Sequence, residues 1–374
     1  MAIGQSALES LVMKAAVDQG FWQGKRVFLT GHTGFKGGWL SLWLASMGAK
    51  VTGYSRSPGT QPNLFESASV ETVLERSIIG DIRDANALAV AMSDAQPEIV
   101  LHLAAQALVR YSYVNPVETY STNVMGTVHV LEAIRQCKSV RAAVMVTSDK
   151  CYQNNEWPWG YRENEPMGGH DPYSNSKGCA ELVTAAYRQS FFSGENVVAI
   201  ATGRAGNVIG GGDWSADRLV PDALAAFHAG RNLMIRNPNA IRPWQHVLEP
   251  LSGYLTLAQA LVAGGAEYTG GWNFGPNDAD ARSVREVIEM VIEQWGASAA
   301  WQQDGAEQPY EANFLKLDCS KARQLLGWTP RWNLSKAVAE TVAWHRTWQS
   351  QKNMQEICLA QINRYSALTN TNHP

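Results

Sequence analysis

The stretch T-S-D-K-C-Y places a hydroxyl, a carboxylate, an ammonium and a phenol directly after a run of apolar residues. Within it, Ser148, Asp149 and Lys150 are consecutive, and Tyr173 and Lys177 follow further along the chain. Each of these side chains alone has an ordinary structural explanation. Together they are residue types that carry protons to and from a substrate. The sequence therefore predicts a proton-transfer site where a strand leaves the core.

Tyr173 and Lys177 are four residues apart, so on a helix their side chains share one face. A free phenol has a pKa of about 10, and a neighbouring ammonium favours its phenolate form. We expect Tyr173 to act as the base, Lys177 to support it and to hold a ribose hydroxyl, and Ser148 to donate to the same substrate oxygen. A Tyr-x-x-x-Lys pair can also be an exposed helical pair. Ser148 at the strand exit favours the catalytic interpretation.

Asp149 and Lys150 exceed what the oxidation of a sugar hydroxyl requires. A ketone acidifies its neighbouring C–H, and loss of water from the next carbon needs a base for that proton and an acid for the departing hydroxyl. Asp149 and Lys150 are the candidates for this pair. The alternative is that Asp149 caps the loop and Lys150 is solvated.

A glycine-rich loop predicts where a dinucleotide binds. Its glycines have the spacing G-x-x-G-x-x-G, between a strand signal at residues 25–30 and an amphipathic run at residues 39–47. Glycines let the backbone approach a pyrophosphate, whose charge meets the free N–H groups of the following helix. A tight turn between strand and helix is the alternative. The loop residues expected to contact the cofactor are Gly31, His32, Thr33, Gly34, Phe35, Lys36 and Gly37.

The end of the second predicted strand leaves the dinucleotide's identity open. An acidic residue there usually indicates NAD, but this place reads Gly-Tyr54-Ser-Arg56 and carries no carboxylate. Arg56 would suit a 2′-phosphate. After the third strand signal, Asp81 and Ile82 are expected to position the adenine, or Asp81 only caps a turn.

Short apolar strands alternate with helical segments in the first 200 residues, which predicts an α/β fold with a Rossmann-type, doubly wound parallel sheet. The expected strands are residues 25–30, 51–54, 99–103, 142–146 and 197–201, and the expected helices are residues 39–47, 84–95, 116–137 and 172–189. A smaller mixed α/β C-terminal substrate lobe is expected to follow, with helices at 282–295 and 333–349 and a strand at 271–274 that returns to the Rossmann sheet. The expected division is an N-terminal extension at 1–22, an NAD-binding domain at 23–205, the lobe at 206–352 and a C-terminal tail at 353–374.

The bulk composition narrows the function class. The chain has 374 residues, is 45% hydrophobic and 17% charged, and carries a formal net charge of -3. These values favour an ordinary globular protein and disfavour a nucleic-acid partner. Five dispersed cysteines without metal-ligand spacing predict reduced thiols and no metal site, and the lack of a long apolar run predicts a cytoplasmic protein without a membrane partner.

Over residues 22–350 the chain resembles the extended short-chain dehydrogenase/reductase family and, within it, the nucleotide-sugar 4,6-dehydratases. The motifs that carry the resemblance are G-H-T-G-F-K-G-G-W at 31–39, V-L-H-L-A-A-Q at 100–106, N-V-M-G-T at 123–127, T-S-D-K-C-Y at 147–152, Y-S-N-S-K at 173–177, R-A-G-N-V at 204–208, G-G-G-D-W at 210–214, D-R-L-V-P at 217–221, R-P-W-Q-H-V at 242–247 and E-A-N-F-L-K-L-D at 311–318. The later motifs are more specific than the glycine loop.

The resemblance implies a bound NAD that takes hydride from C4 of a glucosyl ring and returns it to C6 after water has left across C5 and C6. It is strongest to the branch that acts on CDP-glucose, in which a lysine, here Lys150, follows the aspartate where other branches have glutamate. In that cycle Asp149 protonates the C6 hydroxyl, while Lys150 either removes the C5 proton or stabilises the enolate. Deoxysugar biosynthesis for lipopolysaccharide O-antigen and a homodimer, or a higher homo-oligomer, are implied as well.

The site residues implied by the family motifs extend this set. Further cofactor contacts are expected at Leu103, Ala104, Ala105 and Asn123. Arginine forks match phosphate oxygens, so Arg218 and Arg242 are expected at the substrate pyrophosphate with Asn207 as a neutral donor. The other expected substrate contacts are Gln106, Trp214, Leu219 and Gln245.

Three other functions share part of these motifs. A nucleotide-sugar 4-epimerase has the loop and the Ser-Tyr-Lys set but does not need Asp149 and Lys150, and a 4,6-dehydratase could act on another nucleotide hexose. A dinucleotide-sensing scaffold would not need Tyr173 and Lys177, which this chain retains.

Overall fold

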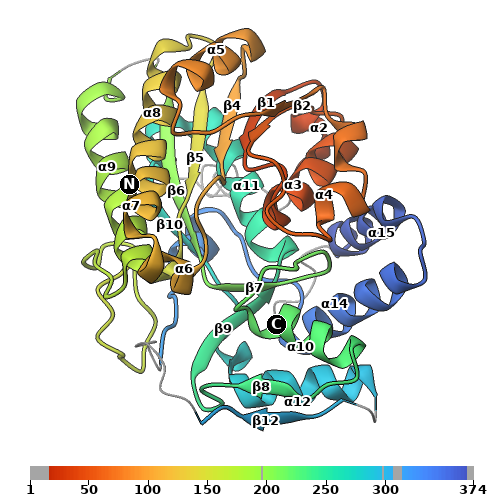
Figure 1. Cartoon of the computed structure of the whole chain (residues 1–374). Helices are drawn as coiled ribbons and strands as arrows, with labels where there is room; N and C mark the ends of the chain where they lie inside the picture. The colour runs from red at the N-terminus through yellow and green to blue at the C-terminus, as the bar shows by residue number, and fades with distance from the viewer. Residues whose placement is uncertain (1–16, 195–196, 297–298, 306–313, 369–374) are drawn as a thin grey trace, which may run out of the picture.

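A seven-stranded parallel sheet forms the centre of the molecule (Figure 1). The computed structural model describes residues 17–194, 197–296, 299–305 and 314–368. The sheet order is β10-β6-β5-β4-β1-β2-β3. Its strands are β1 (Arg26–Thr30), β2 (Lys50–Ser55), β3 (Arg76–Ile79), β4 (Ile99–His102), β5 (Ala142–Val146), β6 (Ala199–Ala205) and β10 (Gly270–Phe274). The predicted doubly wound α/β fold is confirmed, and the strand predicted at 271–274 pairs in parallel with β6.

Helices cover both faces of this sheet, so its central strands are buried throughout. One face packs against α3 (Phe35–Ser46) and α11 (Leu248–Gly264), and the other against α5 (Ala85–Ala95), α8 (Gly126–Gln136) and α9 (Pro172–Phe191) (Figure 1). The strand order reverses between β1 and β4, because the chain adds β2 and β3 on one side and β5 and β6 on the other. Parallel sheets bind ligands at the carboxyl ends of their strands beside such a reversal.

The single helix predicted at 116–137 is divided into three parts. It consists of α7 (Pro116–Tyr120), a π-helical turn (Ser121–Met125) and α8. Asn123 lies in the π turn, where it accepts a hydrogen bond from the Gln106 N–H and donates one to the Gln106 carbonyl. The π-helical turn therefore holds the backbone of the loop after β4 in place through Asn123.

A smaller lobe packs below the carboxyl edge of the sheet (Figure 1). Its strands are β7 (Asn207–Ile209), β8 (Leu233–Ile235), β9 (Ile241–His246), β11 (Ala281–Ser283) and β12 (Trp301–Gln303), and its helices are α10 (Leu219–His228), α12 (Val284–Trp295) and α14 (Leu334–Gln349). These elements enclose a core of their own. The helix predicted at 282–295 begins two residues later, at Val284. Ser283 is its N-cap and forms a capping box with Glu286, so the residues before it belong to β11.

Two packed helices lie where the sequence indicated weak periodicity or a tail. Helix α11 is buried along almost all of its length, so it lacks the polar face that marks an amphipathic helix. Helix α15 (Met354–Ser366) lies within the expected tail and packs against α3. Most of the expected N-terminal extension lies outside the described residues, which begin just before α2 (Gln19–Trp22).

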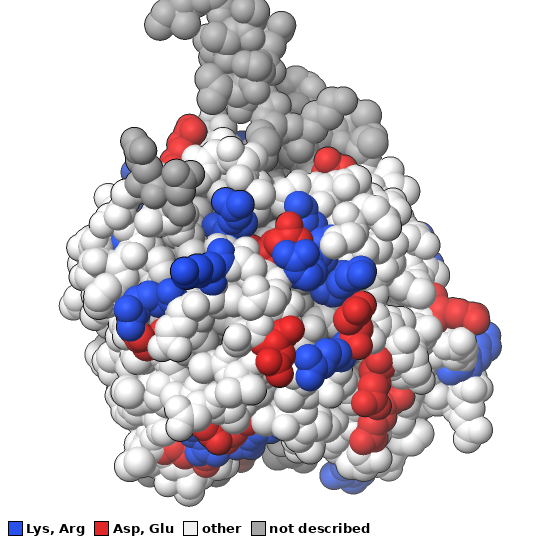
Figure 2. Space-filling view, turned by 90° about the horizontal axis from the view of Figure 1, so that it is seen from above, with Lys and Arg blue, Asp and Glu red and all other residues white. Residues whose placement is uncertain are grey.

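Short helical segments complete the described chain. They are α4 (Leu64–Ser67), η1 (Val70–Val73), α6 (Val109–Val114), η3 (Asp149–Cys151), η4 (Gly265–Tyr268), η5 (Asp278–Asp280) and α13 (Ser320–Leu325). No helix among the described residues is long and apolar enough to span a bilayer. On the face seen from above, basic side chains lie beside acidic ones (Figure 2).

Candidate active site

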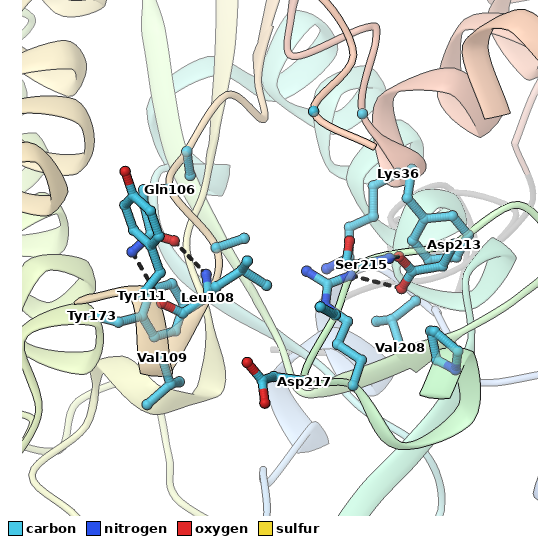
Figure 3. A pocket seen from close by; sticks show the side chains of 18 of the residues that line it. Lys36, Gln106, Leu108, Val109, Tyr111, Tyr173, Val208, Asp213, Ser215 and Asp217 are labelled. Atoms are coloured by element: carbon cyan, nitrogen blue, oxygen red, sulfur yellow. Dashed lines mark hydrogen bonds and ion pairs between the residues drawn. The ribbon is translucent and has the colours of Figure 1, made fainter. Parts of the chain in front are cut away.

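A cavity of about 1170 Å³ lies between the sheet and the smaller lobe. Residues that follow six of the parallel strands line it, from Gly31 after β1 to Asn207 after β6. Figure 3 shows Gln106, Leu108 and Tyr173 on one wall and Lys36 and Asp213 on the opposite wall. Typical small-molecule pockets measure about 300–1000 Å³, so this one has room for a dinucleotide and a second ligand.

The glycine loop joins β1 to α3 and forms part of the cavity wall. A Cβ on Gly37 would lie 2.0 Å from the Gly31 carbonyl oxygen, so only glycine allows this close turn. Gly34 is the N-cap of α3, and no side chain caps the first turn. Uncapped N–H groups at a helix N-terminus suit a phosphate, which is the observation that fits a dinucleotide here.

Charged side chains at the ends of β2 and β3 are paired with one another. The Asp81 carboxylate accepts three hydrogen bonds from the Arg83 guanidinium, at 2.6, 3.0 and 3.1 Å, which hold the pKa of Asp81 below its usual range. Arg56 donates to Glu118 of α7 at 3.2 Å. All these residues except Arg83 line the cavity.

Ser148, Asp149 and Lys150 form the start of the short helix η3 after β5. Ser148 Oγ accepts from the Lys150 N–H at 3.2 Å and donates to Asp149 Oδ1 at 2.9 Å. Asp149 is buried, and its Oδ2 atom has no hydrogen-bond partner. Burial raises the pKa of the Asp149 carboxyl, and the charge of Lys150 opposes this rise. Asp149 therefore has the environment of a carboxyl that keeps its proton.

Tyr173 and Lys177 begin α9, where Pro172 occupies the first turn and Asp171 caps the helix by accepting from the Ser174 N–H. Burial raises the pKa of Tyr173 to about 12, against the effect of a hydrogen bond with Ser148. Burial lowers the pKa of the Lys177 ammonium to about 8. The Lys177 ammonium donates to the Val146 carbonyl at 3.4 Å, which places it at the end of β5. The structure thus brings the predicted Ser-Tyr-Lys set together.

A buried ion pair below this set was missed by the sequence reasoning. Glu181 and Arg204 are joined at 2.7 Å, and Glu181 also accepts from the Thr147 and Thr202 hydroxyls. Its negative charge partly offsets the effect of burial on the pKa of Lys177. Glu181 is four residues beyond Lys177, so the helical spacing was the available signal. Tyr152 accepts from Arg204 at 2.7 Å and is therefore a buried part of this pair's surroundings.

The cations that the sequence assigned to a substrate pyrophosphate also line the cavity, with Arg218 beside Asp213 on the opposite wall. Asp213 accepts from Arg218 at 2.7 Å, and Asn207, Arg218 and Arg242 all line the cavity. Lys36 lies on the same wall as Asp213 (Figure 3), and burial together with the charges of Arg218 and Lys177 lowers its pKa to about 8. The sequence assigned Lys36 only to the cofactor and did not single out Asp213.

Most of the predicted site residues line this one cavity. The lining set includes Gly31, Thr33, Gly34, Phe35, Lys36, Gly37, Arg56, Asp81, Ile82, Leu103, Ala104, Ala105, Gln106, Ser148, Asp149, Lys150, Tyr173, Lys177, Asn207, Trp214, Arg218, Leu219 and Arg242. Trp214 also packs its ring against Trp344 and Trp348, so it belongs partly to the core.

Four predicted contact residues lie behind the wall. His32 contacts Ser77 Oγ through Nε2 at 2.9 Å, and burial lowers its pKa to about 4. Tyr54 donates to the Asp81 carbonyl, Asn123 holds Gln106, and Gln245 donates to the Phe274 carbonyl. Tyr54 and Asn123 thus hold the backbone of lining segments, whereas His32 and Gln245 bind residues outside the lining set.

Comparisons with known proteins agree with this arrangement. The sequence profile of the GDP-mannose 4,6-dehydratase family matches residues 28–341. A CDP-glucose 4,6-dehydratase from Salmonella typhimurium is 56% identical over 357 residues, which cover 94% of this chain and 99% of the relative. A dTDP-glucose 4,6-dehydratase from Xanthomonas campestris is 25% identical, covering 86% of this chain and 93% of the relative.

Solved structures share the fold. MoeE5 in complex with UDP-glucuronic acid and NAD is 25% identical, with a TM-score of 0.72 over 87% of this chain and 99% of that one. The dTDP-glucose 4,6-dehydratase DesIV from Streptomyces venezuelae, with NAD bound, is 23% identical, with a TM-score of 0.74 over 87% of this chain and 100% of that one.

Proposed function

This chain belongs to the nucleotide-sugar 4,6-dehydratases of the extended short-chain dehydrogenase/reductase family, and we propose that it converts CDP-D-glucose to CDP-4-keto-6-deoxy-D-glucose and water. The observation that carries the dehydratase assignment is the buried Asp149, which has one unpartnered carboxyl oxygen and is joined through the other to Ser148, the hydrogen-bond partner of Tyr173. The CDP-glucose substrate is taken from the relative that is 56% identical.

NAD is the cofactor of this reaction, and the cavity fits it. The uncapped first turn of α3 would hold its pyrophosphate, Asp81 and Ile82 its adenosine half, and Lys177 a ribose hydroxyl. The chemistry that NAD supplies when bound is reversible hydride transfer, from C4 of the hexose at the start and to C6 at the end. The dehydration consumes no reductant as a result.

Tyr173 takes the proton of the 4-hydroxyl in the first step. Its high pKa in the free protein makes the phenolate costly, so the nearby Lys177 ammonium is needed to stabilise it. Ser148 orients the same substrate oxygen by a hydrogen bond. The Glu181–Arg204 pair lies under Lys177 and keeps its ammonium charged.

Asp149 and Lys150 carry the elimination. Asp149 gives its proton to the C6 hydroxyl, which leaves as water, and its raised pKa keeps that proton available. Lys150 either removes the C5 proton or stabilises the enolate as a cation. In a Lys150→Ala variant, solvent deuterium entry at C5 separates the two roles, because entry at the wild-type rate is inconsistent with Lys150 as the base.

Two arginines that line the cavity bind the substrate diphosphate. Arg218 and Arg242 match phosphate oxygens, with Asn207 as a neutral donor. Asp213 holds Arg218 through their 2.7 Å ion pair and so orients the Arg218 guanidinium before the substrate binds. Gln106, Trp214 and Leu219 line the remaining space for the nucleoside and the sugar.

Exposed apolar residues along α7 and α9 support a homodimer. Val117 is 82% exposed, Leu182 59% and Phe191 52%, although other residues of these helices are buried. A helix face of this kind suits a second copy of the chain. Sedimentation equilibrium of the purified protein measures the mass of the assembly. The five free cysteines support a cytoplasmic location, and use of the product in lipopolysaccharide O-antigen stays a prediction.

One product analysis tests the proposed function. The protein is incubated separately with CDP-, dTDP-, UDP- and GDP-glucose without added reductant, and CDP-glucose is expected to give the most 6-deoxy-4-ketosugar. Deuterium placed at C4 is expected on the methyl carbon of the product. A product that keeps its C6 hydroxyl would instead identify a 4-epimerase, which has no use for Asp149.

A further inference from the structure

The end of β2 lacks the acidic residue that NAD-binding sheets usually carry. Ser55 ends the strand and Arg56 follows it, and both line the cavity. The Thr33 hydroxyl of the glycine loop donates to the Arg56 carbonyl at 2.8 Å, so this corner is fixed to the cofactor loop. An arginine in this position ordinarily binds the 2′-phosphate of NADP.

A carboxylate reaches this corner from another part of the chain. Glu118 lies on α7, 62 residues from Arg56 in sequence, and its Oε1 atom is 3.2 Å from the Arg56 guanidinium. The same oxygen is 3.7 Å from Arg83, and the Tyr111 hydroxyl donates to the other carboxylate oxygen. The Tyr111 hydrogen bond and the two arginines hold the pKa of Glu118 below its usual range, so it is ionised.

Within this cluster the charges balance without a phosphate. The cations are Arg56 and Arg83, and the carboxylates are Asp81 and Glu118, so the formal sum is zero. A 2′-phosphate adds about two negative charges and would stand beside the Glu118 carboxylate. An unphosphorylated ribose adds none, and its hydroxyls can donate to a carboxylate.

We propose that Glu118 is the residue that selects NAD over NADP in this chain. It supplies from α7 the carboxylate that β2 lacks, and it neutralises the arginine that would otherwise attract the 2′-phosphate. This inference rests on the proposed function for its cofactor class but not for its sugar substrate. Glu118 acts on binding, so it is a specificity residue and takes no part in the chemical steps.

Dinucleotide affinity tests the proposal without any turnover. Dissociation constants for NADH and NADPH are measured by calorimetry on cofactor-free protein. The wild type is expected to bind NADH more tightly, and Glu118→Gln is expected to raise the affinity for NADPH by about tenfold while weakening NADH slightly. Adding Arg56→Ala to Glu118→Gln is expected to remove the gain, because the freed guanidinium is what binds the phosphate.

Glu98 provides a matched control. It is paired with Lys25 and Arg26 and has a similar side-chain exposure, 26% against 29% for Glu118, but it immediately precedes β4 at the opposite end of the sheet. Glu98→Gln is expected to leave the NADH-to-NADPH ratio unchanged. Tyr111→Phe keeps the Glu118 charge and is expected to change the ratio less than twofold, which separates charge from lost packing.

Two measured dinucleotide preferences would overturn this proposal alone. One is a Glu118→Gln ratio within twofold of the wild type, and the other is a wild type that binds NADPH as well as NADH. A chain that prefers NADH through Glu118 but makes no ketosugar from CDP-glucose contradicts only the proposed substrate. A chain that binds neither dinucleotide contradicts both.

Discussion

Two aspartates that follow strands of the same sheet have opposite surroundings. Asp149 follows β5 and is 2% exposed, with one carboxyl oxygen unpartnered and a raised pKa. Asp81 follows β3, its side chain is 30% exposed, and Arg83 donates to both of its oxygens and lowers its pKa. A strand end thus places a carboxylate in the cavity wall, but burial and partners decide whether it carries a proton or a fixed charge.

Asp149→Asn is expected to have the largest effect of the substitutions that test this contrast. The amide keeps the shape of the side chain but has no acidic proton for the leaving hydroxyl, so kcat for ketosugar formation is expected to fall by about 10²- to 10⁴-fold. Oxidation at C4 is expected to persist, seen as a transient rise in reduced-dinucleotide absorbance.

The matched change at the other end is Asp81→Asn. Its expected effect is a weaker affinity for NAD with kcat within about threefold of the wild type, because Asp81 holds a fixed charge. Equal losses of kcat in the two variants would show that the surroundings do not separate the roles.

Gly206→Ala tests the packing that holds Asp149 in place. A Cβ on Gly206 would lie 2.9 Å from Asp149 Oδ2 and 2.6 Å from the Pro243 ring, so the carboxyl must shift. A displacement approaching 1 Å at a proton donor costs about 100-fold in rate, and we expect a loss of that order in kcat. Thermal melting serves as the control, because a variant that also loses most of its stability reports on the fold and not on Asp149.

Sequence reasoning predicted the parts of the site that depend on short-range order. The glycine loop, the run from Ser148 to Lys150, and Tyr173 with Lys177 each lie on a single strand end or helix turn, so spacing alone defines their geometry. Glu118 and Glu181 were not predicted, because their arginine partners are 62 and 23 residues away in the sequence. Such pairs form only after the sheet has aligned its strand ends, and the one local signal was the four-residue spacing of Lys177 and Glu181 on a helix.

The same limit applies to the fold. The amphipathic helices and the apolar strands of the first 200 residues were recognisable because one face is polar or because the run is short. Helix α11 is buried on almost all sides between the sheet and its neighbours, so it has no exposed polar face and offered no clear period to detect. The π turn at Asn123 was invisible for a related reason, since one extra residue barely alters a helical pattern.

Glu249 sharpens the comparison, because it is buried like Asp149 but has partners for both oxygens. It accepts from the backbone N–H groups of Arg331 and Trp332 and from the Tyr365 hydroxyl. Burial nevertheless raises its pKa to about 7, against the effect of these hydrogen bonds and of the Arg331 charge. Burial therefore outweighs good hydrogen bonding in setting its charge.

Because the pKa of Glu249 is raised, the free energy of unfolding is expected to depend on pH. The folded protein holds the Glu249 proton more tightly than the unfolded chain, so its contribution is full below about pH 4.5 and is lost as pH rises towards about 7. Relative to Glu249→Gln, which cannot titrate, the wild type is expected to lose on the order of 2–3 kcal/mol of unfolding free energy between pH 5 and 8. Urea denaturation across this range measures the difference, and parallel curves for the two proteins would contradict the prediction.

Arg83→Met is expected to have the smallest effect. It removes the partner of Asp81, but the pair is partly exposed, and such pairs contribute about 0–1 kcal/mol to stability. The lowered pKa of Asp81 adds stability above the ordinary carboxyl range that fades as pH falls, so any loss in the variant should shrink in acid. NAD affinity is expected to fall by about threefold, since Asp81 keeps its charge and loses only its orientation. A tenfold loss of NAD affinity, measured by calorimetry, would mean that the exposed Asp81–Arg83 pair fixes the adenosine end as firmly as burial fixes Asp149. The two aspartates would then differ in their chemistry and not in how firmly they are held.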